Sequence, residues 1–198
     1  MSRRLTAQDW IDFALTTLAH EGADALKADV LARKLGVSRG SFYWHFSDLG
    51  AFHARTIEHW RVVTTEAIIA DIERHESREE RLDALLRRAF AGTAVLEVRM
   101  RAWADANAEA ARAVSDIDRR RQEYIERMLV EAGIAQVQAA TRAQLLYWSY
   151  LGAALSQSRL SGERLDQAVA ELKRLGLGGS PGPPAAIALR HRRRCPRS

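Results

Sequence analysis

The sequence predicts an all-α protein of about nine helices, with a three-helix helix-turn-helix head followed by a helical bundle. Two observations support this fold class. Apolar residues recur at spacings of three and four along most of the chain, as they do on the buried face of a helix. Nowhere does an alternation of apolar and polar residues rich in β-branched side chains persist, as a half-buried strand would require. We therefore expect helices and no sheet.

Three short helices are expected within the first 46 residues. Thr6 can cap the first helix, with Asp9 in the capping-box position three residues later, and Gly22 is expected to end it. The second helix is predicted at about residues 28–34, and the third begins after Ser38, whose hydroxyl suits an N-cap.

A long helix is predicted from residue 48 to about residue 75, and it could join two domains as a rigid strut. The segments after it carry more apolar residues than a three-helix head could bury, so they must form their own core. Five more helices are expected, at residues 82–96, 98–106, 110–132, 138–160 and 163–175. The predicted domains are a helix-turn-helix head at 1–47, a second helical domain at 48–176, and a disordered basic tail at 177–198.

The segment from Val30 to Phe46 meets the physical requirements of a helix-turn-helix. Ala32 is small where two helices cross closely, and Gly36 can adopt the positive φ that the tight turn requires. The apolar seam between the helices is formed by Leu31, Leu35, Val37 and Phe42. This agreement over many positions makes the helix-turn-helix the most specific signal in the chain, and a hairpin used only for packing is the alternative.

The charge distribution supports DNA binding locally rather than globally. The formal net charge is +5, but five arginines lie between Gly176 and Ser198, which leaves 25 basic and 25 acidic residues in the rest of the chain. Between Lys27 and Phe46, by contrast, four basic residues accompany one acid. The helix-turn-helix is therefore a positive surface on a neutral body.

Seven residues are predicted to contact DNA. The second helix of a helix-turn-helix enters the major groove with its N-terminal residues toward the base edges. Arg39 can there pair with a guanine, Tyr43 can bond a phosphate, and Trp44 either touches a thymine methyl or packs on the long helix. The full set is Lys27, Arg39, Gly40, Ser41, Tyr43, Trp44 and His45.

The run Gly36–Phe46, followed by an acidic residue and a long helix, resembles the TetR family of helix-turn-helix transcriptional regulators. The resemblance extends from Ala7 to about Phe52, and it implies a dimer that pairs through the last two helices. One position departs from the family, which usually has a lysine that meets a phosphate where this chain has Leu49. Either DNA affinity is lower than usual, or the contact comes from another group: Lys27, Arg39, Arg3 or Arg4.

A homodimer interface is predicted on the last two helices. The segment Gln144–Leu155 is apolar nearly all round, as expected of a helix that is buried on one side by its own domain and on the other by a partner. The final helix carries an apolar stripe, and two such pairs would form a four-helix interface. The candidates are Trp148, Gly152, Leu155, Leu165, Val169 and Leu172. The alternative is that both helices are internal core.

A ligand pocket is predicted between the later helices, although no sequence pattern identifies a ligand. Its candidate apolar lining is Phe90, Met100, Trp103, Tyr124, Met128 and Tyr147, each of which is otherwise an ordinary core residue. Candidate polar anchors are Glu97, Arg99, Arg101 and Asp105.

The function predicted from these observations is DNA-binding transcriptional regulation, with a repressor released from a palindromic operator by an unknown small-molecule effector. The main alternative is an all-helical ligand-binding or protein-interaction dimer without specific DNA binding, and an enzyme on an all-α scaffold is the third reading. No nucleophile elbow, phosphate loop or metal-ligand spacing supports catalysis, a metal or a cofactor. A single cysteine and the lack of a membrane-length apolar run predict a cytoplasmic protein.

Overall fold

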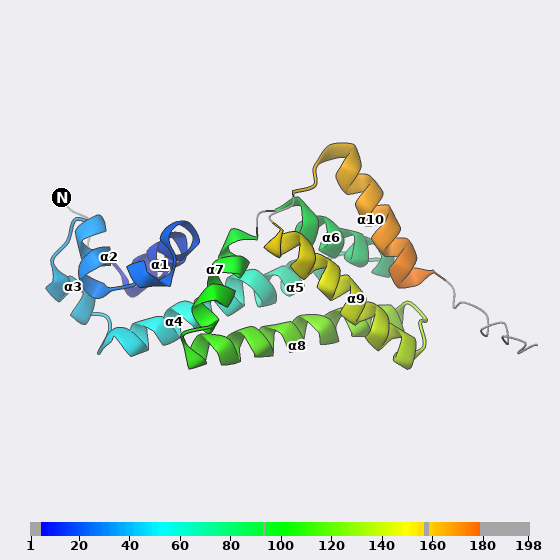
Figure 1. The fold of residues 1–198 in the computed structure, drawn as a ribbon. Coiled ribbons are helices and arrows are strands. Elements are labelled where there is room, and N and C mark those ends of the chain that lie inside the picture. The colour runs from blue at the N-terminus through cyan, green and yellow to red at the C-terminus, as the bar shows by residue number, and fades with distance from the viewer. Residues whose placement is uncertain (1–4, 93, 157–158, 179–198) are drawn as a thin grey trace, which may run out of the picture.

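The computed structural model describes residues 5–92, 94–156 and 159–178, and these ranges contain helices and no strand. Figure 1 shows an elongated molecule with the first three helices at one end and α9 and α10 toward the other. The head consists of α1 (Ala7–Glu21), the 3₁₀ turn η1 (Ala23–Ala25), α2 (Ala28–Lys34) and α3 (Arg39–Tyr43). The remaining elements are α4 (Leu49–Arg61), the π turn η2 (Val62–Glu66), α5 (Ala67–Ile72), α6 (Arg78–Ala91), α7 (Val95–Ala104), α8 (Ala108–Glu131), α9 (Gln136–Leu155) and α10 (Gly162–Leu177). The all-α prediction is confirmed, and α4, η2 and α5 together form one continuous helix.

The first helix begins and ends where its capping residues predict. The backbone N–H and hydroxyl of Thr6 both donate to the Asp9 carboxylate at 2.7 Å, and the Asp9 N–H donates to the Thr6 hydroxyl at 3.2 Å. Gly22 ends the helix at a φ of 86°, which a residue without a Cβ adopts easily. Ser38 occupies the N-cap of α3 as expected, but its hydroxyl makes no capping hydrogen bond. The predicted side-chain cap at Ser38 is therefore wrong.

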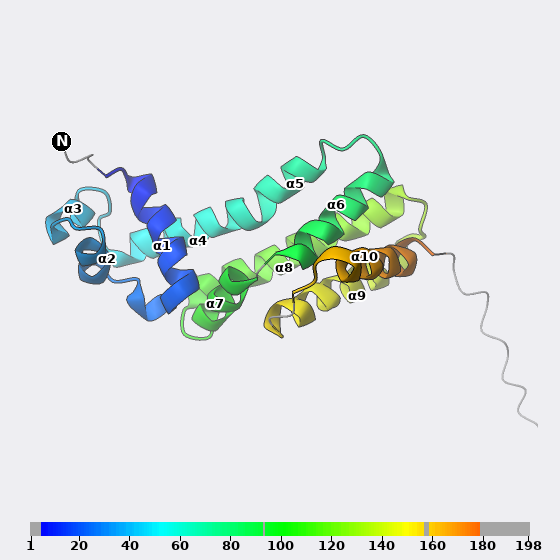
Figure 2. The same ribbon diagram turned by 90° about the horizontal axis from the view of Figure 1, so that it is seen from above.

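The long helix after the head is present and contains an irregularity that the sequence did not reveal. The Asp48 carboxylate accepts the Ala51 N–H at 2.8 Å and fixes the start of α4. Five residues, Val62–Glu66, adopt a π-helical turn before the α-helix resumes and ends at Ile72. In Figure 2 this rod runs from the head along the body beside α8. π turns inside α-helices frequently mark functional sites.

Three of the expected boundaries of the later helices are wrong, and one of them is the end of α9, which lies at Leu155 rather than at residue 160. α6 starts at Arg78 rather than at residue 82, because Ser77 and Glu80 form a capping box within the charged stretch. The break between α6 and α7 follows Ala91, where Gly92 leaves the helix, rather than residues 96–98. The earlier break brings Leu96 and Glu97 onto α7.

The apolar side chains form two core clusters, which we call the head cluster and the body cluster. The head cluster joins α1–α4 to one face of α7 and to the first half of α8, including Met100, Trp103 and Ile117. The body cluster joins α5, α6, α9 and α10 to the second half of α8. The head therefore shares its core with α7 and α8, beyond the expected domain boundary at residue 47.

Candidate nucleic-acid interface and ligand cavity

The recognition helix α3 is held in place by one buried aromatic residue. Phe42 is fully buried and meets the rings of Trp10 at 5.5 Å and Phe52 at 5.1 Å edge-on. It also packs against Phe46, with 5.0 Å between ring centroids. Such pairs favour these offset and edge geometries. Because Phe42 turns one face of this short helix into the core, the opposite face points outward at the end of the molecule (Figure 1).

The outward face of α3 carries a pre-arranged cation. Arg39 donates from Nη2 to the Tyr43 hydroxyl at 3.2 Å, and its guanidinium lies 5.5 Å from the centroid of the Tyr43 ring. The hydrogen bond to Tyr43 raises the pKa of Arg39 above its ordinary value. Trp44 is 77% exposed, so it does not pack on the long helix as a core residue. An arginine fixed in this way can present its N–H groups to a base edge or a phosphate.

The turn between α2 and α3 depends on Gly36. Its φ is 67°, and the Val37 N–H donates to the Ala32 carbonyl at 3.0 Å to close the turn. No atom lies within 4 Å of the position of a Cβ at Gly36, so the requirement for glycine comes from its backbone conformation and not from a lack of space. The predicted role of Gly36 is confirmed.

Leu49 occupies the first position of α4 and packs, half-buried, against the head cluster. The position at which the TetR family usually has a phosphate-binding lysine is therefore used for packing in this chain. Arg55 lies two turns beyond the Asp48 cap, is exposed, and places its guanidinium 5.5 Å from the centroid of the Phe46 ring. Arg55 is a candidate for the phosphate contact that the sequence analysis did not identify. Arg3 and Arg4, two of the candidates that it did identify, lie outside the described residues.

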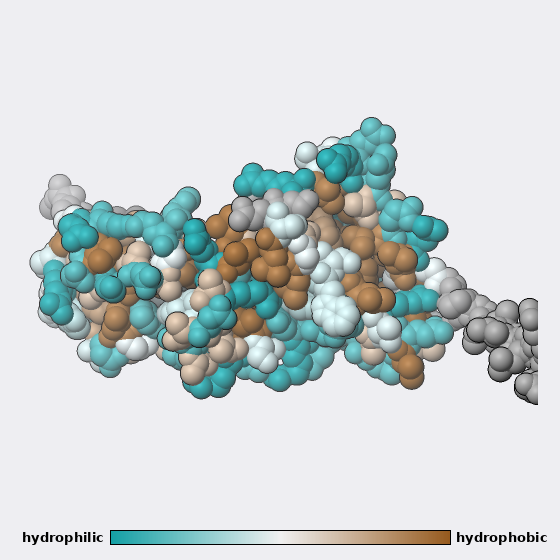
Figure 3. All heavy atoms as spheres, viewed as in Figure 1, coloured by the Kyte–Doolittle hydropathy of each residue, from teal (hydrophilic) through white to brown (hydrophobic). Residues whose placement is uncertain are grey.

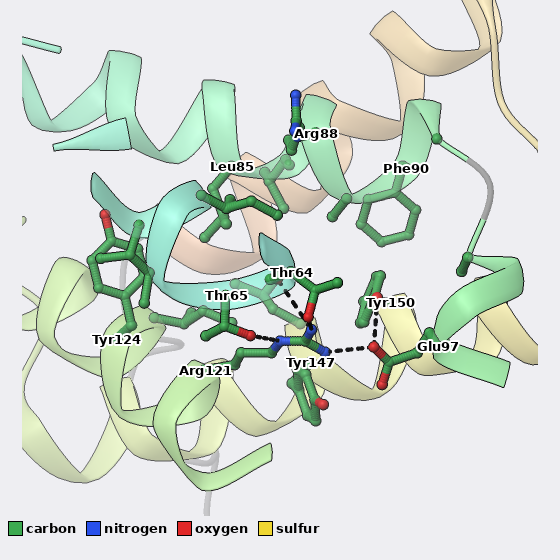
Figure 4. A pocket seen from close by; sticks show the side chains of 18 of the residues that line it. Thr64, Thr65, Leu85, Arg88, Phe90, Glu97, Arg121, Tyr124, Tyr147 and Tyr150 are labelled. Carbon is green, nitrogen blue, oxygen red and sulfur yellow. Dashed lines mark hydrogen bonds and ion pairs between the residues drawn. The ribbon is translucent and has the colours of Figure 1, made fainter. Parts of the chain in front are cut away.

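A cavity of about 560 Å³ lies in the body, between the π turn and helices α5 to α9. Its walls are mainly aliphatic and aromatic, and Figure 4 shows Leu85, Phe90 and Tyr124 around its apolar part. A volume of this size is within the range of small-molecule sites. The π turn contributes Val63, Thr64 and Thr65 to the wall, so the helix that leaves the head also lines the cavity.

Arg121 connects the cavity wall to the π turn. Its Nε donates to the Thr65 hydroxyl at 3.0 Å, and its Nη2 donates to the Thr64 carbonyl at 3.2 Å and hydroxyl at 3.3 Å. Its Nη1 donates to the Glu97 carboxylate at 2.9 Å, as Figure 4 shows. A backbone carbonyl of the irregular turn is thus satisfied by a side chain from α8.

Glu97 is the buried centre of a polar network at this end of the cavity. Only 4% of its side chain is exposed, and it accepts hydrogen bonds from Arg101 at 2.7 and 2.9 Å as well as from Arg121. The Tyr150 hydroxyl donates to the same carboxylate over a longer 3.4 Å. Arg101 also donates to Asp118, which accepts the Tyr147 hydroxyl at 2.6 Å. Two carboxylates and two guanidiniums thus pair within one network.

The two arginines of this network and the Tyr150 phenol have pKa values well above neutrality. Burial alone would lower the pKa values of Arg101 and Arg121, but Asp118 and Glu97 outweigh it at Arg101 and Glu97 does so at Arg121, so both pKa values are raised. Burial together with Glu97 raises the pKa of Tyr150 to about 12. Both arginines are therefore charged and the phenol is neutral at pH 7.

Residues 11–48 match the family model of the bacterial regulatory proteins of the tetR family. The head of this chain is therefore a TetR-type DNA-binding domain. The match covers α1 to the cap of α4, the part that the sequence motif predicted, and identifies the chain as a DNA-binding transcriptional regulator.

Solved structures share the fold of this chain over most of its length. A transcriptional regulator from Rhodococcus sp. Rha1 is 19% identical with a TM-score of 0.68, over 87% of this chain and 95% of that one. The reduced form of NemR from E. coli is 20% identical with a TM-score of 0.70, over 85% and 96%. A protein from Saccharomonospora viridis in complex with choline is 15% identical with a TM-score of 0.64, over 84% and 93%. A search of curated protein sequences finds no match.

The structure places six of the seven predicted DNA contacts on α3 or directly after it. Arg39, Gly40 and Tyr43 are exposed, and Ser41 and His45 are partly exposed. Lys27, the seventh, is exposed at the N-cap of α2.

The predicted pocket residues divide between the two clusters. Phe90, Tyr124 and Tyr147 line the cavity. Met100 and Trp103 do not, because they lie on the face of α7 that packs in the head cluster. Met128 is buried in the body cluster without lining the cavity. Of the suggested polar anchors, Glu97 lines the cavity. Arg101 does not line it but donates a hydrogen bond to Glu97. Arg99 and Asp105 are exposed and do not line the cavity.

The predicted dimer residues also divide. Trp148 and Leu155 are 59% and 58% exposed on α9, and Gly152 is exposed on the same helix face. Leu165 and Leu172 pack, partly buried, against the body cluster. Val169 is only 1% exposed, so its side chain belongs to the core of the protomer and its assignment to the interface is wrong. Further exposed apolar side chains on α9 and α10, outside the six candidates, are Val137, Leu145 and Leu175.

No helix in the described ranges has the length and apolarity that crossing a membrane would demand. Within the same ranges, no three His, Cys, Asp or Glu side chains gather in a way that could hold a metal ion.

Proposed function

We propose that this regulator is a homodimeric repressor that binds a palindromic operator through α3 and releases it when a small molecule occupies the cavity. In this proposal residues 1–47 contact DNA in the cytoplasm, residues 48–176 bind the effector and dimerise, and the chain performs no catalysis. The observation that supports it best is that one continuous helix, α4–η2–α5, begins beside the recognition helix and also lines the cavity.

The proposed DNA contacts are Lys27, Arg39, Gly40, Ser41, Tyr43, Trp44 and His45. Arg39 is the residue that we assign to base recognition, because its side chain is held by Tyr43 on the outer face of α3. Arg55 joins the set as a phosphate contact, since it is exposed two turns along α4 from the end of the motif.

The proposed dimer interface is the outer face of α9 with part of α10. Val137, Leu145, Trp148 and Leu155 are large exposed apolar residues at helical spacing on α9. Figure 3 shows apolar surface gathered over the region where α9 and α10 lie in Figure 1. A contiguous exposed apolar patch of this kind marks an interaction surface, and a twofold axis through it would pair two heads.

Arg121 is proposed to couple effector binding in the cavity to the position of the head. A molecule in the cavity lies against both the π turn and the guanidinium that bonds to Thr64 and Thr65. Ligand binding can therefore favour one of two arrangements of the turn, and with it one of two head positions. The S. viridis protein of the same fold holds choline in its structure, which supports a small-molecule site in general terms.

DNA binding to the intergenic region beside the gene tests the regulator proposal. Purified protein is titrated onto this fragment and onto a scrambled fragment across a salt series, together with Arg39→Ala and Arg119→Ala. Arg119 is a matched control because it is an exposed arginine on α8, far from the head along the chain. We expect selective binding by the wild type and by Arg119→Ala, with selectivity reduced about 5- to 100-fold in Arg39→Ala. Equal, weak binding to both fragments by the wild type would contradict the proposal.

A further inference from the structure

The polar end of the cavity is electrically balanced. Glu97 and Asp118 carry two negative charges, Arg101 and Arg121 carry two positive charges, and each group bonds to at least one of opposite sign. The side chains are 4%, 25%, 20% and 13% exposed in that order. An ionised ligand that entered this space would lose its water and find no spare counter-charge.

Among the described residues that line the cavity, Arg88 is the remaining charged one, and it is exposed at the surface of α6. In Figure 4 its side chain points away from Arg121 and from the polar network. Its charge is therefore hydrated and contributes little to the field inside the cavity.

Within the polar network, the Tyr150 hydroxyl is the group whose existing hydrogen bond is weakest. The Tyr150 hydroxyl donates to Glu97 over 3.4 Å, whereas the Arg121 donors bond at 2.9–3.3 Å and the Tyr147 hydroxyl bonds at 2.6 Å. A hydrogen bond of that length is weak. A ligand carbonyl could accept from this phenol, and a ligand hydroxyl could donate to the Glu97 carboxylate beside it.

We propose that the cavity selects uncharged, mainly apolar molecules that carry one hydrogen-bonding group, which Tyr150 and Glu97 receive. This inference rests on the proposed effector role of the cavity and specifies the class of effector. It excludes fatty acids, other organic anions and quaternary ammonium ions as preferred ligands, although the apolar lining alone would accept the chains of all of them.

Two fluorescent probes that differ by one charge test the proposal on the full chain without DNA. N-phenylnaphthylamine is neutral, and anilinonaphthalene sulfonate adds a sulfonate to the same ring system. We expect one neutral probe to bind per chain at least about tenfold more tightly than the sulfonate. Decanol should displace the neutral probe at lower concentration than decanoate or decyltrimethylammonium. If either ion competes as well as decanol, the proposal is overturned.

Two variants connect this selectivity to the cavity. Ala89→Trp fills the space from α6 and should abolish binding of the neutral probe, whereas Ala70→Trp, on the exposed face of α5, should retain it. Glu97→Gln leaves one guanidinium unbalanced, so the affinity ratio of the sulfonate to the neutral probe should rise at least about tenfold. An unchanged ratio in a folded Glu97→Gln variant would overturn the charge-balance argument.

Failure of this inference and failure of the proposed function give different results. Preference for an ion, with binding blocked by Ala89→Trp, would overturn the ligand class and leave the effector site in place. Binding of the neutral probe that Ala89→Trp does not change would show that the cavity is not the site. Operator binding is measured separately on DNA and depends on neither result.

Discussion

Arg39 and Arg121 show how the same side chain serves opposite purposes in this protein. Arg39 lies on the outer face of α3, braced by Tyr43, with its remaining N–H groups directed to solvent. Arg121 is mostly buried, and its donors bond to Thr64, Thr65 and Glu97. The planar fork of a guanidinium suits both tasks, because it holds several acceptors in a fixed geometry. Lysine would replace neither residue well.

Replacing Leu49 by lysine should strengthen DNA binding. The residue stands at the start of α4, where the TetR family usually places a lysine, and here it packs half-buried on the head cluster. We expect Leu49→Lys to raise affinity about three- to tenfold at low salt and to steepen the dependence of log affinity on log salt by about one unit. Leu49→Gln is the control for the loss of packing without a new charge. Equal affinities for the two variants would show that the position does not face a phosphate.

The sequence identified the outward residues of the head better than the inward residues of the body. Arg39, Gly36 and Phe42 follow from local requirements of a helix-turn-helix, so their spacing alone suffices. Arg121 was missed because it follows Arg119 and Arg120 and looks like part of a solvated charge run. Its spacing from Ile117 and Tyr124, both buried on α8, does place it on the inner face.

The helix formed by α4, η2 and α5 has a capped N-terminus and a π-helical segment at its centre. Its first turn is capped by Asp48, and its centre follows the wider π geometry over five residues. No proline or glycine occurs among Val62–Glu66, so the sequence offers no local signal for this turn. It is stabilised instead by contacts from α8, which single-sequence patterns do not reveal. In the same way, only the packing of α7 between two clusters explains why Met100 and Trp103 do not line the cavity.

The Asp48 cap should make head stability depend on pH. Hydrogen bonds from the Ala51 backbone and the Ser47 hydroxyl lower the pKa of Asp48 in the folded protein. A lowered folded pKa gives stability that is complete above the unfolded value and lost as pH falls through the folded value. Wild type should therefore exceed Asp48→Asn in Tm at pH 7, and the gap should close as pH drops below about 4. Thermal unfolding from pH 7 to pH 3 measures it. An Asp24→Asn control accounts for the loss of one surface charge, and a gap that does not vary with pH would contradict the expectation.

Removing one contact to the π turn should destabilise the body. Thr65 is buried, and its hydroxyl accepts a hydrogen bond from Arg121 at 3.0 Å. Thr65→Val keeps the shape and leaves a buried guanidinium N–H unsatisfied, so we expect a loss of about 1–3 kcal/mol in the free energy of unfolding. Thr16→Val is the matched control, because that hydroxyl is exposed and bonds only to the carbonyl of its own helix. Urea titration of both variants measures the difference, and equal losses would contradict a role for the Arg121 contact.

At the level of the whole molecule, the two clusters meet along α7 and α8. The head cluster reaches Met100, Trp103 and Ile117, so the head is not packed as a separate unit. His53 strengthens this junction, with its ring 5.0 Å from that of Trp103 and its Nε2 2.9 Å from the Leu26 carbonyl. Movement of the head therefore has to carry part of α7 with it or repack this junction.

The outer face of α9 should hold two protomers together. Burying the Trp148 indole in a partner would supply much of the interface, and a carboxylate in its place would be desolvated without a counter-ion. We expect Trp148→Glu to convert a dimer into a monomer at micromolar concentration and to weaken operator binding at least about tenfold. Light scattering after gel filtration measures the mass. Val130→Glu, an exposed apolar residue on α8, should remain dimeric, and a dimeric Trp148→Glu would place the interface elsewhere.

The position of the π turn also determines how far a rotation of α4 moves the recognition helix. The 13 residues of α4 form an arm of roughly 20 Å between the π turn and the start of the rod beside the recognition helix. Rotation of that arm by about 10° moves its far end by roughly 3.5 Å, which is close to the 3.4 Å rise between successive bases along one strand. A molecule that rotates the arm by this angle would thus shift each recognition helix by about one base step. Two heads displaced in opposite directions would no longer fit the same site.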